Sequence, residues 1–168
     1  MMTIWAPRRS PLLRFKRRQW RNLIKELGGR GEGRREAGAF LLAPRNDIHC
    51  VSRVEYFDDL DPNCLKGHVH IDGRAFSKLW DACESDGLVV VGDVHTHPGS
   101  SVRQSPIDMA NPMVARAGHI ALIVPHLATR SVRPRQVGVH QYEGDDGWTS
   151  WFGKEASTRL SVRSWPWM

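Results

Sequence analysis

Short apolar runs alternate with amphipathic segments along this chain, and that alternation is typical of an α/β domain. Apolar and β-branched runs predict buried strands over residues 39–43, 49–57, 88–97, 119–124 and 137–142. Helical spacing of apolar positions predicts one helix over residues 12–27, stopped by Gly28-Gly29, and another over residues 73–83 behind an Asp72 cap. This order predicts an α/β fold with a mixed, mostly antiparallel sheet flanked by helices.

The two ends of the chain are expected to differ from the domain between them. Residues 1–11 are predicted to form a flexible basic arm, and residues 12–147 form the domain itself. Residues 148–168 hold four tryptophans, which predict a tail packed on the domain. The terminal Trp165-Pro166-Trp167 also suits contact with a partner, and that alternative stays open.

The stretch from Leu88 to Asp108 contains the pattern with the clearest chemistry. Its first part, Leu-Val-Val-Val-Gly-Asp-Val-His-Thr-His-Pro, predicts a strand that ends at Pro98, because proline cannot donate to a sheet ladder. Side chains alternate across a strand, so His95 and His97 are expected on one face. Two imidazoles on one face can share a metal ion.

A helix start follows this strand and adds a carboxylate. Ser105 is a favoured N-cap, Pro106 suits the first helical position, and Asp108 falls in the first turn. Two histidines and one aspartate make a three-ligand zinc site with a fourth position open to water, which is the pattern of a catalytic zinc. Each residue alone also suits an ordinary strand end or helix start. Together at one junction, they favour the metal.

At this point the sequence resembles the JAMM metalloproteases, also called the JAB or MPN-plus family. Their signature His-x-His-(x7)-Ser-x-x-Asp is filled here by His95, His97, Ser105 and Asp108. The family also carries a glutamate before a small-Gly-hydrophobic strand, and Glu36 precedes the matching Ala-Gly-Ala-Phe. The resemblance implies a single MPN (JAB) domain with cytidine deaminase-like architecture, and one Zn²⁺ per chain.

The resemblance also implies a role for each of these residues. His95, His97 and Asp108 would hold the zinc, which acidifies a water molecule for attack on the scissile carbonyl. Glu36 would take the proton and return it to the leaving amine. Ser105 would donate a hydrogen bond to the oxyanion.

Four neighbouring positions are weaker candidates. Gly99, Ser100 and Ser101 are small and leave room for an extended substrate tail beside the catalytic strand. Asp93 lies two positions before His95 and is expected on the same face. It is either a hydrogen-bonding partner for an imidazole or a plain strand residue.

The implied substrate is a bond after the C-terminal glycine of ubiquitin or a ubiquitin-like protein. The chain lacks long insertions and is similar to the short prokaryotic JAB proteins, some of which are encoded beside ubiquitin-like proteins and E1- and E2-like enzymes. A bacterial deconjugating isopeptidase or peptidase is therefore the first hypothesis, with such enzymes as expected partners. A processing protease for a sulfur-carrier protein and a non-catalytic MPN scaffold are the alternatives. Scaffolds usually lose metal ligands, whereas this chain keeps the full set.

Composition and charge narrow the remaining classes. With 40% hydrophobic and 25% charged residues among 168, the chain has the composition of one soluble globular domain. No apolar run reaches the roughly 20 residues of a membrane span, and no secretory signal is recognisable. The net charge of +6 suggests nucleic-acid binding as a function, but no known nucleic-acid-binding motif accompanies the arginines. A basic surface that steers an acidic partner protein explains the charge at least as well.

Cysteine usage points to a reducing compartment. The three cysteines form no Cys-x-x-Cys pair, so they indicate neither a disulfide framework nor a thiolate zinc site. This favours the cytoplasm.

Other zinc chemistries lack their motifs in this chain. Zinc deaminases need His-x-Glu with Pro-Cys-x-x-Cys, and other zinc proteases carry a His-Glu-x-x-His helix; neither occurs here. A second His-x-His, formed by His68 and His70, is not followed by Ser-x-x-Asp at the required distance. It is therefore a poor candidate for a second metal site.

Overall fold

The structure, a computed structural model, describes residues 10–66 and 69–164, and these fold into eight strands and five α-helices. The strands are β1 (Leu13–Lys16), β2 (Gly38–Pro44), β3 (Arg53–Tyr56), β4 (Leu88–Thr96), β5 (Ile120–Val124), β6 (Gly138–Tyr142), β7 (Trp148–Trp151) and β8 (Leu160–Arg163). The helices are α1 (Arg17–Gly31), α2 (Phe57–Leu60), α3 (Gly73–Asp86), α4 (Pro106–Ala110) and α5 (Gly153–Arg159). Three short 3-10 turns lie between the later strands: η1 (His126–Ala128), η2 (Pro134–Gln136) and η3 (Gly144–Asp146).

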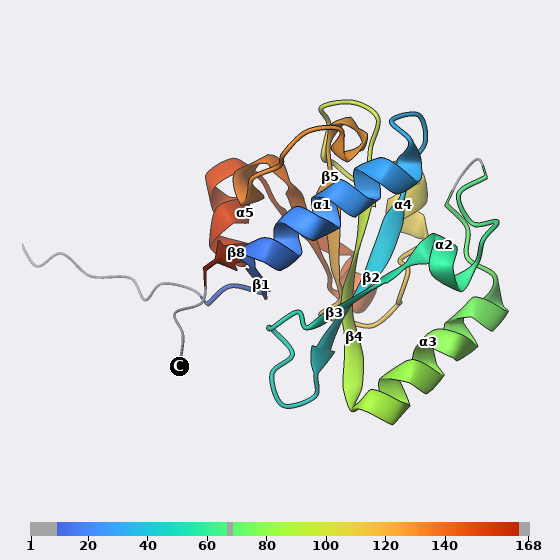
Figure 1. Cartoon of the computed structure of the whole chain (residues 1–168). Helices are drawn as coiled ribbons and strands as arrows, with labels where there is room; N and C mark the ends of the chain where they lie inside the picture. Colours follow the sequence, from blue (N-terminus) through green and yellow to red (C-terminus); the bar gives the residue numbers. More distant parts are fainter. Residues whose placement is uncertain (1–9, 67–68, 165–168) are drawn as a thin grey trace, which may run out of the picture.

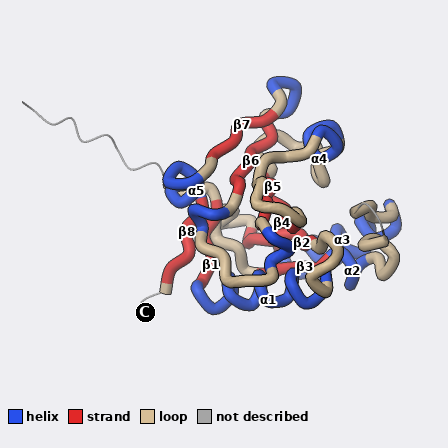
Figure 2. Tube along the Cα trace, turned by 90° about the horizontal axis from the view of Figure 1, so that it is seen from above, coloured by secondary structure: helices blue, strands red, loops and turns tan. Residues whose placement is uncertain are grey.

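Six of the strands form one sheet at the centre of the molecule (Figure 1). Its order is β3-β2-β4-β5-β6-β7, and β4–β5 is its single parallel pair among the described strands. Seen from above, α1 lies on one side of the strands and α4 on the other (Figure 2). The predicted mixed, mostly antiparallel sheet flanked by helices is therefore confirmed.

The core lies where β2, β4 and β5 run side by side. The side chains of β5, and those of β2 up to Ala43, are all buried, which explains why these strands read as nearly unbroken apolar runs. Helix α1 adds the buried side chains of Trp20, Leu23, Ile24 and Leu27 and turns most of its arginines to solvent. The basic face of this helix is thus a solvated face.

The first predicted helix begins later than its apolar spacing indicates. Residues 13–16 form β1, which pairs in parallel with β8 so that Leu13 lies opposite Leu160. Phe15 is buried and packs edge-on against Trp20, with ring centroids 5.2 Å apart. The prediction of helix from residue 12 was wrong, because a partner strand more than 140 residues away decides the backbone conformation here.

The same helix also ends later than predicted. It continues through Gly28 and Gly29 to Gly31, and Glu32 closes it in the left-handed conformation at φ 52°. A Cβ on Gly28 would lie 2.6 Å from the carbonyl oxygen of Ala128. Gly28 is therefore needed for the close approach of α1 to η1, and interpreting it as a helix stop was wrong.

The predicted strand over residues 49–57 is shorter in the structure, where β3 covers Arg53–Tyr56. Phe57 is fully buried against Phe40 and begins α2 instead. Arg30 fixes this turn to the end of α1 by hydrogen bonds of 2.7 Å to Asp58 and 2.8 Å to Asp59. The helix behind Asp72 is confirmed, since the Asp72 carboxylate accepts a hydrogen bond from the backbone N–H of Arg74.

Residues 148–164, predicted from sequence as part of a packed tail, add one strand to the sheet and another that pairs with β1. β7 adds an edge strand beside β6, and β8 pairs with β1 near the other end of the chain. Ala156 of α5 and Leu160 of β8 are buried in the core. Residues 1–9 of the predicted arm, His68 of the second His-x-His, and Trp165 and Trp167 lie outside the described residues.

None of the helices in the described ranges combines the length and the apolar character that crossing a membrane requires.

Candidate metal centre

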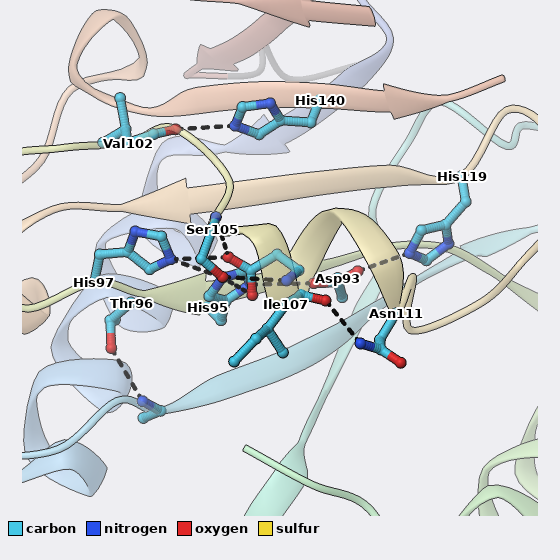
Figure 3. A network of polar contacts seen from close by, with 12 residues as sticks. Asp93, His95, Thr96, His97, Val102, Ser105, Ile107, Asn111, His119 and His140 are labelled. Carbon is cyan, nitrogen blue, oxygen red and sulfur yellow. Dashed lines mark hydrogen bonds and ion pairs between the residues drawn. The ribbon is translucent and has the colours of Figure 1, made fainter. Parts of the chain in front are cut away.

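The two histidines of the central strand converge at its carboxyl end. His95 belongs to β4, and His97 is the first residue after the end of β4. Their Nε2 atoms lie 3.2 Å apart, as expected for side chains on one face of a strand (Figure 3). Thr96 points to the other face and accepts a hydrogen bond from the Ala37 N–H at 3.0 Å. The alternation predicted from sequence is realised.

The carboxylate reaches the histidines from the first turn of α4. The Ser105 hydroxyl accepts the backbone N–H of Asp108 at 3.1 Å, and the Asp108 Oδ2 accepts the backbone N–H of Ser105 at 2.7 Å. This reciprocal capping box fixes the aspartate side chain at the helix start. Its oxygens lie 3.6 Å from Nε2 of His95 and 3.4 Å from Nε2 of His97.

These separations fit a bound zinc ion. Ligands that bond to zinc at 2.0–2.1 Å in a tetrahedron lie roughly 3.3–3.4 Å from one another. The two Nε2 atoms are 3.2 Å apart, and they lie 3.6 Å and 3.4 Å from different oxygens of Asp108, so each contact is near that value. With one ligand atom taken from each residue, the three atoms lie within 4.8 Å of one another. His95, His97 and Asp108 form the one group in the described residues whose ligand atoms are close enough to hold a metal ion. Three ligands leave the fourth tetrahedral position open.

Charge is concentrated at this centre. Burial by itself lowers the pKa of His95, but the carboxylates of Asp108 and Asp93 outweigh it and raise that pKa to about 10. Burial raises the pKa of Asp108, and its contacts with the two histidines lower it by more, to well below the ordinary value. A cation, either a proton or a metal, is therefore strongly favoured between these groups.

Glu36 precedes β2 at the same end of the sheet. β2 runs antiparallel to β4, with Gly38 opposite His95 and a backbone hydrogen bond of 2.9 Å from Thr96 to Ala37. Glu36 lies two residues before the paired part of β2, and its carboxylate is not part of the ligand group formed by His95, His97 and Asp108. A Cβ on Gly38 would lie 2.3 Å from the Phe57 ring, so this position beside His95 requires glycine.

The loop between His97 and Ser105 is exposed and is held by its backbone. Gly99, Ser100 and Ser101 are solvent-exposed, and a Cβ on Gly99 would meet nothing within 4 Å. The carbonyl of Gly99 accepts the N–H of His126 at 2.9 Å, and the carbonyl of His97 accepts that of Leu127 at 2.8 Å. These bonds hold the start of the loop against η1, while its three small residues stay exposed to solvent.

The residues that supply these two hydrogen bonds are strained. His126, Leu127 and Ala128 have φ of 55°, 52° and 55°, three consecutive left-handed residues of which none is glycine. Each costs roughly 1–2 kcal/mol relative to the right-handed conformation. Such strain persists where the surrounding structure fixes the backbone. Here the strained turn donates the two hydrogen bonds that hold the chain just after β4. No pattern in the sequence indicated this turn.

Behind His95 lies a buried carboxylate–imidazole pair. Asp93 and His119 are 1% and 2% exposed, and His119 Nε2 lies 2.7 Å from Asp93 Oδ1 (Figure 3). The other oxygen of Asp93 lies 3.6 Å from Nδ1 of His95, which is longer than a hydrogen bond. Asp93 therefore faces the ring nitrogen that points away from the metal position, where a carboxylate orients the imidazole. Asp93 was a candidate from sequence, whereas His119 was missed.

A second buried histidine, also missed, anchors the loop. His140 of β6 donates through Nε2 to the carbonyl of Val102 at 2.9 Å (Figure 3). Its Nδ1 contacts the Ser150 hydroxyl at 2.7 Å. Burial lowers the pKa of His140, which favours the neutral ring. A Cβ on Gly138 would lie 2.0 Å from the same carbonyl oxygen, so loop and strand are in close contact. A polar residue inside an apolar strand is the only sequence signal for this role.

Fold and site together define a class of protein: a single α/β domain with a candidate metal centre of two histidines and one aspartate at the end of its central strand. A model of the family described as prokaryotic homologs of the JAB domain matches residues 27–136. That match covers well over half of the 168 residues. The chain therefore belongs to this family, as its motif predicted.

Two solved structures with TM-scores above 0.5 share this fold. A protein from Desulfitobacterium hafniense is similar with a TM-score of 0.60 and 18% identity, over 89% of this chain and 92% of that one. A protein from Salinibacter ruber follows with a TM-score of 0.55 and 16% identity, over 82% and 86%. A JAB1/MPN domain protein from Archaeoglobus fulgidus matches with a TM-score of 0.45 and 15% identity, over 89% and 96%.

Proposed function

We propose that this protein is a zinc-dependent peptidase or isopeptidase that cleaves after the C-terminal glycine of a ubiquitin-like protein. The observation that carries the proposal is that His95, His97 and Asp108 each bring one ligand atom within 4.8 Å of the others, which suits a zinc site with one open position. Family membership supports it, because the JAMM signature is complete in this chain.

The ligands and their neighbours divide the chemistry among them. When bound, zinc would lower the pKa of a coordinated water and polarise the scissile carbonyl. Glu36, two residues before β2, takes up a proton and delivers it to the leaving amine. The Ser105 hydroxyl oxygen accepts the Asp108 N–H, and the hydroxyl proton is the group that is donated to the developing oxyanion.

An extended C-terminal tail suits the approach to this centre. The exposed loop at Gly99, Ser100 and Ser101 presents no bulky side chain beside the end of β4. A glycine-ended tail can lie there by backbone contacts, as in strand addition to a sheet edge. We take conjugates of a ubiquitin-like protein, made by E1- and E2-like enzymes, as the natural substrates.

Two alternatives remain distinct in their predictions. A processing protease for a sulfur-carrier protein would use the same residues on a linear precursor. A non-catalytic scaffold would need neither Glu36 nor Ser105, and the intact capping box that positions Asp108 favours the enzyme.

The test is cleavage of ubiquitin-like proteins fused through their C-terminal glycine to a reporter. Glu36→Gln should lower kcat by about 10²-fold or more, the contribution of a general acid–base group, while the zinc content stays at one per chain. A metal chelator should abolish cleavage, and added Zn²⁺ should restore it.

Glu55→Gln is the control, because Glu55 is a glutamate of β3 that pairs with Arg53, away from the histidines. Its activity should equal that of the wild type. Wild-type rates in Glu36→Gln would show that Glu36 is misassigned, and chelator-insensitive cleavage would rule out the zinc mechanism.

A further inference from the structure

A groove runs between helix α1 and the segment that follows η1. Its volume is about 590 Å³, which lies within the range of ligand-binding clefts. One wall is α1 from Trp20 to Gly29, a stretch that rises roughly 14 Å. The other wall is residues 128–132, which lie alongside the helix (Figure 1). An extended peptide of about four residues is long enough to fill this groove.

The floor of the groove is apolar, and its two walls are fixed to each other. Trp20, Ile24 and Val132 are 3%, 5% and 7% exposed, so their side chains lie below the surface. The Trp20 indole N–H donates to the Val132 carbonyl at 2.7 Å and joins the walls. At the other end, Gly28 lets α1 approach Ala128. The walls are therefore in place before a ligand binds, which lowers the cost of binding.

The rim of the groove is basic. Arg21 and Lys25 are four residues apart and so lie on the same side of α1, and Arg130 comes from the opposite wall. All three are exposed. No acidic residue lines the groove, and none of the three cations pairs with a carboxylate of the described residues. Arg30, on the same helix, pairs with three carboxylates. The charges at the groove are thus available to a ligand.

An apolar floor below a basic rim defines the chemistry of the occupant. A peptide that carries both apolar side chains and carboxylates matches the two at once. Nucleic acid fits less well, because its bases stack on exposed aromatic rings and Trp20, the aromatic residue of this groove, is buried. A membrane surface also fits poorly, because the apolar side chains lie below the cations and do not project.

We propose that this groove binds an acidic, apolar peptide segment of a partner protein. The segment lies between α1 and residues 128–132, with apolar side chains on the floor and carboxylates beside Arg21, Lys25 and Arg130. This gives a function to basic residues that the metal centre does not use. An enzyme and a non-catalytic scaffold could both bind such a segment, so the proposal stands apart from the proposed function.

The first experiment is a selection from a phage library of random dodecapeptides on the full-length protein, with depletion on Gly29→Phe. Gly29 lines the groove, and a Cβ there would meet nothing within 4 Å, so phenylalanine occupies the space without entering the core. The enriched peptides should combine Asp or Glu with large apolar residues. A fluorescent copy of the most enriched peptide should bind the wild type roughly tenfold more tightly than Gly29→Phe.

The second experiment tests the basic rim with the same peptide. Lys25→Glu should raise Kd roughly tenfold, because an attraction becomes a repulsion, and added salt should raise Kd for the wild type. Lys154→Glu is the matched control, since it makes the same change in net charge at an exposed lysine of α5 outside the groove. Its Kd should equal that of the wild type. Melting temperatures of all variants confirm that the fold is intact.

Three results would overturn the proposal. A selection that yields no peptide able to distinguish the wild type from Gly29→Phe would show that the groove binds no peptide. Enriched peptides without carboxylates, or equal weakening by Lys25→Glu and Lys154→Glu, would show that the rim does not recognise them. A single-stranded RNA oligonucleotide that binds more tightly than the peptide, and is weakened by Gly29→Phe and Lys25→Glu, would identify nucleic acid as the occupant.

Discussion

His95 lies between the carboxylates of Asp93 and Asp108, and these two charges determine the protonation state in which the site binds a metal. The pKa of about 10 means that, in the metal-free protein, a proton occupies the imidazole at neutral pH. Because the folded pKa lies above the usual value of about 6.5, this proton stabilises the fold below pH 6.5 and the contribution is lost as the pH rises through 10. Zinc needs the neutral imidazole and must displace that proton.

Zinc affinity should therefore depend on pH. Between pH 7 and pH 9 the dissociation constant is expected to fall about tenfold per pH unit, with release of about one proton per zinc. Isothermal titration calorimetry in buffers of different ionisation enthalpy measures both quantities. An affinity that does not change over this range would contradict a protonated His95 held by Asp93 and Asp108.

Single residues were predictable from sequence where their geometry is local. Alternation along one strand placed His95 and His97 together, and the N-cap pattern of Ser105 placed Asp108 three residues later. His119 and His140 were not predictable, because their partners lie 26 and 38 residues away along the chain. Their roles depend on which strands become neighbours in the sheet.

Among the secondary-structure elements, α1 shows how a glycine can be misread. Two adjacent glycines usually indicate a helix end. In the structure both lie inside the helix, and an added Cβ would meet a neighbour only at the first: Gly28 packs against Ala128 in the strained turn beside the histidine strand, whereas Gly29 faces solvent. The two glycines therefore have different reasons to be there.

Substituting each glycine by alanine separates these reasons. Gly28→Ala should lower the free energy of unfolding by about 1–3 kcal/mol, because the new methyl group overlaps the Ala128 carbonyl. Gly29→Ala should raise it by about 0.5–1 kcal/mol, because alanine favours the helix and meets nothing within 4 Å. Urea unfolding of both variants measures these changes in the free energy of unfolding. If both substitutions were stabilising, η1 would not approach α1 as closely as the structure shows.

Elements whose signals are short-range were predicted well, and those created by distant pairing were not. The central strand and the capped α3 and α4 follow from alternation and N-caps within a few residues. β1 carries a helical pattern and becomes a strand only because β8 pairs with it. The left-handed turn at η1 is held by hydrogen bonds to the strand end, which no local pattern reveals.

At the scale of the whole molecule, the C-terminal segment completes the domain. β7 covers the edge of β6, the Trp148 indole holds α4, and β8 joins the last part of the chain to the first. A boundary at residue 147 would cut through this arrangement. The candidate site thus depends on residues that lie after it in sequence.

Truncation tests this dependence. A chain ending at residue 147 loses β7, α5 and β8 and uncovers the core around Leu13, so its stability should drop by more than about 5 kcal/mol, which is comparable to the whole stability of a typical domain. Circular dichroism should show no cooperative melting transition. A truncated chain that melts cooperatively near the wild-type temperature and still binds zinc would contradict this dependence.

The central claim is that His95, His97 and Asp108 together hold one zinc ion, and the most direct measurement is X-ray absorption at the zinc edge with metal analysis of the purified protein. The expected result is about one zinc per chain with two imidazole nitrogens among its ligands, lost in both His97→Ala and Asp108→Asn. A protein that takes up no zinc, or that keeps its zinc with the same ligands in both variants, would contradict it.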